Sequence, residues 1–152
     1  MSKRIIHITS FLFCMLSFSS CSFFGEDLYP SNRCYWIVKN TSDSQIIVCS
    51  ELSLGSKEKT LNPGESYFFI EIDLTKGHAV YFGRMYDYNA VNDTVGIRNA
   101  DNTKTLKIWR ESEKDNQGRQ FFNEEYWTKR EWKEDGSDHH EWTFELLQED
   151  IE

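Results

Sequence analysis

The feature that most constrains the fold is a series of short β-branched and aromatic segments separated by turn sequences, with no amphipathic helix longer than one turn. Such a series predicts an all-β chain in which the strands form an antiparallel two-sheet sandwich, immunoglobulin-like in the broad sense, with Greek-key connections. A small closed barrel is the alternative. The expected strands are residues 33–40, 45–50, 66–72, 79–85, 94–98, 104–109, 126–133 and 140–147.

Turn chemistry between these segments predicts which neighbours pair. Residues 41–44 (TSDS) predict a hairpin between the first two segments, and residues 100–102 predict another between the fifth and sixth. In the last segment Trp142, Phe144 and Leu146 alternate with polar residues, so they should share the buried face. Asn123 is placed to cap a single helical turn.

The N-terminus has the pattern of a secretory signal. Lys3 and Arg4 precede an apolar run of about a dozen residues, which is shorter than the roughly 20 residues that cross a bilayer. The run ends in Ser19, Ser20 and Cys21, which looks like the lipobox of a bacterial lipoprotein, whose mature N-terminus is a lipidated Cys. An ordinary secreted protein cut near Ser20 is the alternative.

These features divide the chain into three parts. We expect a signal peptide over residues 1–20, the lipidated Cys21 with a tether over residues 21–32, and one β-sandwich domain over residues 33–152. The signal carries two basic residues and no acidic ones, so its removal takes the net charge from −8 to −10. A chain this acidic is repelled by nucleic acid and by anionic headgroups, which leaves the N-terminal lipid as its expected contact with a membrane.

Two cysteines remain in the expected domain, Cys34 and Cys49. An even pair in an oxidising compartment is a candidate disulfide, and the predicted hairpin would bring the two side chains within reach. Two small buried side chains whose thiols never meet are the alternative.

No pattern for catalysis or metal binding assembles, so we expect no enzyme, no metal and no cofactor. His139 and His140 are adjacent with acids nearby, but neighbouring residues on a strand point to opposite faces. Asp87, Asn89, Asn92 and Asp93 crowd one loop without the spacing of a calcium loop. No nucleophile elbow is present, and the histidines lack partner patterns.

Five tryptophans in a small domain need an explanation: Trp36, Trp109, Trp127, Trp132 and Trp142. Trp132 lies among charged residues and is the one we expect to be exposed. An exposed Trp beside acids suits sugar binding, so Trp132 and Trp127 are the candidate ligand-binding residues. The alternative is a sandwich edge, where Trp covers the core beside long charged side chains.

Several motifs together resemble small uncharacterised Bacteroidetes lipoproteins. They are the lipobox, Trp36-Ile37-Val38-Lys39-Asn40, Asn62-Pro63-Gly64-Glu65, Leu106-Lys107-Ile108-Trp109, Phe122-Asn123-Glu124-Glu125-Tyr126-Trp127 and Trp142-Thr143-Phe144-Glu145. The resemblance implies a lipid-anchored protein of the cell envelope, with the outer membrane as its expected location. Asp93-Thr94-Val95 also resembles the O-glycosylation site of that phylum, which makes Thr94 a candidate.

No active residue follows from this resemblance. We therefore expect a non-catalytic structural or interaction module whose protein or glycan partner is unknown. The alternative is a small carbohydrate-binding lipoprotein that uses exposed Trp and acidic residues.

Overall fold

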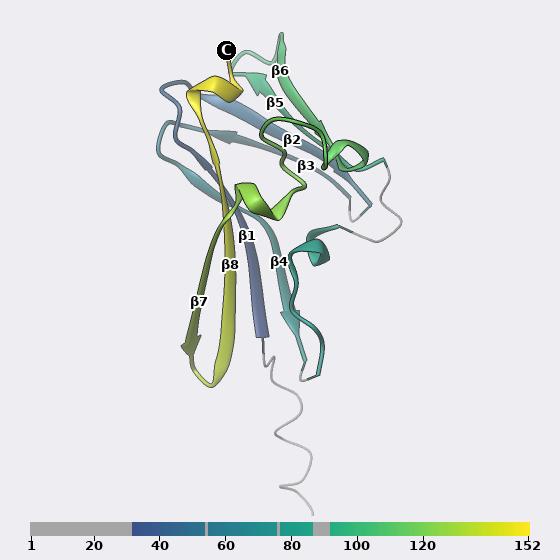
Figure 1. The fold of residues 1–152 in the computed structure, drawn as a ribbon. Coiled ribbons are helices and arrows are strands. Elements are labelled where there is room, and N and C mark those ends of the chain that lie inside the picture. Colours follow the sequence, from purple (N-terminus) through teal and green to yellow (C-terminus); the bar gives the residue numbers. More distant parts are fainter. Residues whose placement is uncertain (1–31, 54, 76, 87–91) are drawn as a thin grey trace, which may run out of the picture.

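A computed structural model of the chain describes residues 32–53, 55–75, 77–86 and 92–152 (Figure 1). They form eight strands in two four-stranded sheets that pack face to face as a β-sandwich, as predicted. The first sheet has the order β4 (Ser66–Leu74), β1 (Asn32–Asn40), β8 (Ser137–Leu146) and β7 (Thr128–Glu134). The second has the order β3 (Gly55–Leu61), β2 (Ile46–Leu52), β5 (Thr94–Asn99) and β6 (Thr105–Arg110).

The two central strands of the first sheet come from opposite ends of the described chain. β1 and β8 run parallel, with Trp36 opposite Trp142, whereas every other strand pair among the described residues is antiparallel. Figure 1 shows the first sheet running down the view, with the second sheet beside its upper half. The β5–β6 hairpin forms as its turn sequence predicts, and β7 and β8 also pair as a hairpin.

The predicted hairpin between residues 33–40 and 45–50 is wrong, because β1 and β2 belong to different sheets. The connection crosses between the sheets, and the buried Asn40 side chain holds it. Its Nδ2 donates to the backbone oxygens of Ser44 (2.8 Å) and Leu61 (3.1 Å), while its Oδ1 accepts from the Ser42 amide (3.1 Å). A side chain that satisfies three backbone groups makes a sharp crossing stable without strand pairing.

The same crossing fastens the Asn62-Pro63-Gly64-Glu65 turn. The Gly64 amide donates to the Asn40 oxygen (2.7 Å), and the Asn40 amide donates to the Glu65 oxygen (2.9 Å). Within the turn, the Glu65 carboxylate accepts from the Asn62 amide at 3.0 Å. Two of the motifs that carry the family resemblance are therefore in direct contact, and both are structural.

Among its described residues, the structure lacks one of the expected strands and contains one that the sequence did not predict. Residues 79–85 do not pair, and Phe82–Met85 form the 3₁₀ helix η2, with Phe82 and Met85 buried. The strand that was not predicted is β3, whose first six residues are exposed and largely polar. An edge strand without an apolar face carries no alternating pattern, so sequence periodicity cannot detect it.

The remaining helices are short 3₁₀ turns. Asn123 caps η4 (Glu124–Tyr126) as predicted, because its side chain accepts from the Glu125 amide at 3.0 Å. No helix in the described part of the chain is long and apolar enough to cross a membrane. Besides η2, the 3₁₀ turns that the described residues form are η3 (Glu111–Glu113), η4 and η5 (Gln148–Asp150).

The core between the sheets is dominated by aromatic rings. Trp36 and Trp142 stack with ring centroids 4.9 Å apart, and Phe82 of η2 packs edge-on against Trp142. Phe121 lies among Trp109, Trp127 and Phe144. Trp142, Phe144 and Leu146 share the buried face of β8, as predicted. The segments that carry η2 and η4 thus cover the part of the first sheet that the second sheet does not reach.

Candidate functional site

The outward-facing side of the first sheet carries a groove of about 360 Å³ around Trp132. Register explains its position: Trp132 of β7 lies opposite His139 of β8, and Tyr35 of β1 lies opposite Glu141 of β8. Because alternate residues of a strand face opposite sides, these residues point away from the core that Trp36 and Trp142 fill. The aromatic part of the groove is Tyr35, Phe68, Trp132 and His139, and the charged part is Arg33, Glu134, Asp135 and Glu141.

Three rings in the groove lie in nearly parallel planes. Trp132 and His139 stack with centroids 4.8 Å apart, Tyr35 and His139 are 5.8 Å apart, and Tyr35 and Trp132 are 6.1 Å apart with an angle of 11°. His139 is 5% exposed, whereas Phe68, which is tilted against Tyr35, is 59% exposed. The groove therefore offers solvent a set of aromatic surfaces that the sheet holds in fixed orientations.

Hydrogen bonds fix two of these rings. The Tyr35 hydroxyl shares a hydrogen bond of 3.2 Å with Nδ1 of His139, and Nε1 of Trp132 donates to the Glu134 carboxylate at 3.2 Å. Burial raises the pKa of the Tyr35 hydroxyl above its usual value, an effect that a hydrogen bond with Arg33 opposes. Tyr35 therefore keeps its proton at neutral pH and can take part in hydrogen bonds as a donor.

The charged rim of the groove includes a tight turn. Asp135 and Gly136 join β7 to β8 with φ angles of 50° and 79°, the left-handed backbone of a two-residue hairpin loop. Arg33 lies 3.8 Å from the Asp73 carboxylate, and the guanidinium of Arg130 lies 4.9 Å from the centre of the Trp132 ring. The groove thus combines aromatic rings with carboxylates, and the Asp135 carboxylate is carried by the tight hairpin loop.

Trp127, the other candidate ligand-binding residue, is in the core, so that prediction is wrong. It is 7% exposed, and its Nε1 donates to the Phe121 oxygen at 2.7 Å. Trp36, Trp109 and Trp142 are also buried. Trp132 is the one tryptophan of the five that is partly exposed.

The candidate disulfide is also wrong, because Cys34 and Cys49 are free thiols on different sheets. Cys34 points into the core, and burial raises the pKa of its thiol to about 11. Cys49 lies on the outward side of the second sheet, where its Sγ donates to the Gly96 oxygen at 3.4 Å. The prediction depended on a hairpin that does not form.

The remaining candidate residues take no part in the groove around Trp132. Cys21, Asp87 and Asn89 lie outside the described residues. Thr94 is partly exposed on β5, so its glycosylation stays a prediction, and the neighbouring Asp93 carboxylate accepts from the Ser53 amide at 2.8 Å. The described residues contain no group of three His, Cys, Asp or Glu side chains that could hold a metal ion.

A second groove, of about 390 Å³, lies on the outward side of the second sheet. Gly96 opens it, because a Cβ at this position would lie 3.2 Å from the Cys49 sulfur. Ile108, which is 44% exposed, is its only large apolar side chain among the described residues. The described lining of this second groove contains no aromatic ring, and two of its cations, Arg98 and Arg110, pair with Glu58 and Glu113.

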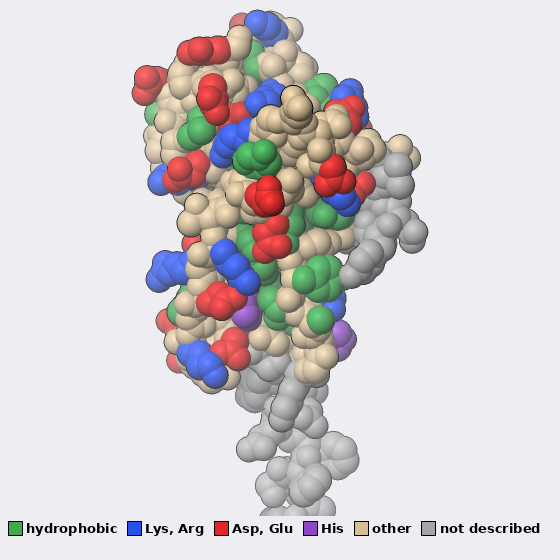
Figure 2. Space-filling model, viewed as in Figure 1, with side chains coloured by type: hydrophobic (Ala, Val, Ile, Leu, Met, Phe, Trp, Pro, Cys, Tyr) green, Lys and Arg blue, Asp and Glu red, His purple; other side chains and the backbone are tan. Residues whose placement is uncertain are grey.

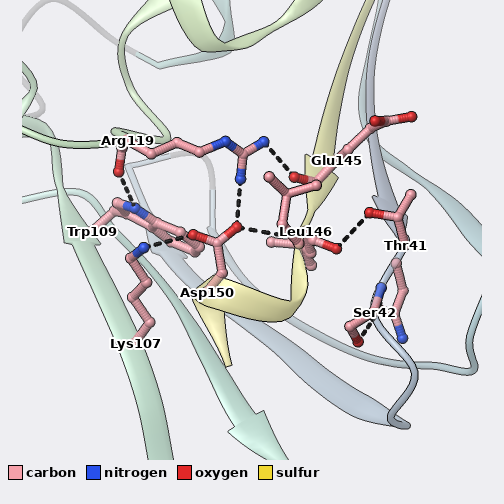
Figure 3. A network of polar contacts seen from close by, with 10 residues as sticks. Thr41, Ser42, Lys107, Trp109, Arg119, Glu145, Leu146 and Asp150 are labelled. Atoms are coloured by element: carbon pink, nitrogen blue, oxygen red, sulfur yellow. Dashed lines mark hydrogen bonds and ion pairs between the residues drawn. The ribbon is translucent and has the colours of Figure 1, made fainter. Parts of the chain in front are cut away.

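The most deeply buried ion pairs are structural (Figure 3). The Asp150 carboxylate is fully buried and pairs with Lys107 of β6 and with Arg119. The same carboxylate accepts from the Leu147 amide at 3.0 Å, and Arg119 also donates to the Glu145 oxygen. This network fastens η5 and the end of β8 to the second sheet.

Sequence reasoning identified Trp132 but not Tyr35, Phe68 or His139. Alternation in β1 could have placed Tyr35 on the face opposite Trp36, yet nothing in the sequence reveals that β1 and β8 are neighbours. Comparison of the chain with protein-family models, with curated proteins and with solved structures finds no match.

Proposed function

We propose that the chain is a non-catalytic, lipid-anchored binding module of the bacterial cell envelope, and that the groove around Trp132 takes a carbohydrate. One observation carries the choice of ligand: the only partly exposed tryptophan lies in a concave site beside parallel aromatic rings and carboxylates. A sugar ring has an apolar face of C–H groups and a rim of hydroxyls. Aromatic rings suit the face, and carboxylates accept hydrogen bonds from the rim.

The exposed apolar surface argues against a large protein interface. Stable protein interfaces bury about 800 Å² per partner and have an apolar centre. In the described part of the chain, the exposed large hydrophobic residues are Phe68 and Ile108, which lie on different sheets. Figure 2 shows acidic and basic side chains interleaved over the visible face, with hydrophobic groups between them. A compact ligand fits this surface better than a broad partner.

The proposed anchor would hold the groove near a membrane. β1 begins at Asn32, eleven residues after Cys21, and an extended chain of that length reaches at most roughly 40 Å. Arg33 and Tyr35, near the start of β1, both line the groove. A lipid on Cys21 would therefore keep the groove within reach of glycans at the membrane surface.

Binding is tested by screening the full-length protein in mild detergent against a glycan array, with Trp132→Ala and Ile108→Ala as a matched pair. Both substitutions remove a partly exposed large side chain, but Ile108 lies on the opposite sheet. We expect Trp132→Ala to abolish glycan signals and Ile108→Ala to retain them. Absence of any signal from the unmodified protein would refute carbohydrate binding.

The anchor is tested separately by Cys21→Ser. The substituted protein should lose incorporation of labelled palmitate and leave the membrane fraction. If it still incorporates palmitate and sediments with membranes, the lipoprotein assignment is wrong.

A further inference from the structure

We propose that the groove prefers sugars that carry a protonated amine over N-acetylated and uronic-acid sugars. This preference rests on the proposed carbohydrate-binding function and specifies its ligand class. Three carboxylates line the groove, those of Glu134, Asp135 and Glu141, against one lining cation, Arg33.

The positive charge of Arg33 is offset by a neighbouring carboxylate. Its Nε lies 3.8 Å from the Asp73 carboxylate, which is outside the groove lining. Arg130, in register with Glu141, lies over the Trp132 ring. Two cations, Arg33 and Arg130, thus stand against four carboxylates, those of Asp73, Glu134, Asp135 and Glu141, so the rim keeps an excess of two negative charges.

Aromatic faces add to this preference. The faces of Trp and Tyr rings carry the negative part of the ring quadrupole and attract cations within about 6 Å. The Arg130 guanidinium, 4.9 Å from the Trp132 centroid, shows that this ring accepts a cation. An ammonium group on a bound sugar would lie among aromatic rings and carboxylates, whereas a uronic carboxylate would meet like charge.

The whole chain strengthens the discrimination. Its net charge of −8 repels anionic polysaccharides before contact and raises the local concentration of cationic ones. An N-acetyl group removes the positive charge but leaves the sugar ring unchanged. Oligosaccharides that differ only in acetylation therefore separate the charge effect from ring stacking.

The test is titration calorimetry of the full-length protein in detergent with chitosan, chitin and galacturonan oligosaccharides of equal length. All three titrations are performed near pH 6. We expect chitosan to bind about tenfold more tightly than chitin, with galacturonan weakest. The difference between chitosan and chitin should shrink in 1 M salt, where charges are screened beyond about 3 Å.

Charge-neutralising variants assign the preference to the rim. Glu134→Gln keeps an acceptor for Nε1 of Trp132, and Asp135→Asn keeps a residue that tolerates a positive φ. In the double variant, the ratio of the chitosan affinity to the chitin affinity should fall close to one. Glu134→Gln is matched by Glu149→Gln, an equal charge change at an exposed residue of η5, which should keep the preference.

The outcomes separate the two proposals. Equal affinity for chitosan and chitin would overturn the amine preference and leave carbohydrate binding intact. A preference that survives the double variant would overturn its assignment to Glu134 and Asp135. Binding of none of the three oligosaccharides would overturn both.

Discussion

The Tyr35 hydroxyl lies 3.2 Å from Nδ1 of His139, although 104 residues separate the two along the chain. The parallel pairing of β1 with β8 creates this contact, because it places Arg33 beside His139 and Tyr35 beside Glu141. His139 also stacks on Trp132 at 4.8 Å. One nearly buried imidazole therefore touches both of the rings that define the groove, and it acts as their positioning residue.

Replacing His139 should disorder the groove more than it destabilises the fold. We expect His139→Ala to weaken oligosaccharide binding about tenfold, because Tyr35 and Trp132 lose a shared support, and to cost about 1–2 kcal/mol of unfolding free energy. Near-UV circular dichroism of Trp132 should change as well. His139→Asn, which keeps a hydrogen-bonding group near the position of Nδ1, should recover part of the affinity. Full affinity in His139→Ala would show that the imidazole does not position the rings.

Trp132 and Trp127 should respond in opposite ways to truncation. Trp132→Ala removes a partly exposed ring, so it should abolish sugar binding and cost less than about 2 kcal/mol in urea unfolding. Trp127→Ala empties a buried site against Phe121 and Phe144, and it should cost about 3–5 kcal/mol. A stability loss for Trp132→Ala as large as that for Trp127→Ala would mean that Trp132 is a core residue, and the groove would lose its binding role.

The hairpin of β7 and β8 shows what the sequence predicts well. Asp135-Gly136 is a strong two-residue turn signal, and Trp142, Phe144 and Leu146 alternate cleanly, so local chemistry alone fixes the pairing and the buried face. Residues 41–44 have equally good turn chemistry, yet they cross between sheets. Turn residues favour a chain reversal, but they do not specify whether the flanking strands pair or separate.

The groove was harder to predict because it depends on strand neighbours. Tyr35, His139 and Trp132 meet only when β1, β8 and β7 lie in that order, and no turn sequence encodes the β1–β8 contact. The sequence singles out His139 only as a metal-ligand candidate, whereas in the structure it is 5% exposed and stacks on the rings of Tyr35 and Trp132. Composition therefore singled out Trp132, whereas the positions of Tyr35 and His139 depend on long-range strand pairing.

The C-terminal network around Asp150 should be essential for stability. Asp150→Ala leaves Lys107 and Arg119 without their buried counter-ion, and we expect it to lower the unfolding free energy by about 3–5 kcal/mol. Glu58→Gln, which breaks the exposed pair with Arg98, is the matched control and should cost less than about 1 kcal/mol. Urea denaturation of both variants measures the contrast. Similar small losses in the two would show that the Asp150 pairs do not hold η5 in place.

Cys34 should make the fold sensitive to alkaline pH. Burial raises the pKa of its thiol from 9.0 to about 11, so between these values the unfolded chain has lost the proton that the folded chain keeps. Because the folded state then binds more protons, stability must fall as pH rises through this window, whereas it is fully retained below pH 9. At about pH 10.5 the loss should reach about 2 kcal/mol, on the scale of 1.36 kcal/mol per pKa unit.

Cys34→Ala isolates this contribution from the other groups that titrate at high pH. Burial also raises the pKa values of Tyr35, Tyr67 and Tyr86, and their effect is common to both proteins. Urea unfolding at about pH 8 and about pH 10.5 should therefore show a drop in stability that is about 2 kcal/mol smaller in Cys34→Ala. The small cavity in the variant lowers stability equally at both pH values, so it cancels in the difference. An identical drop in the two proteins would mean that the Cys34 thiol ionises in the folded chain as readily as in the unfolded one.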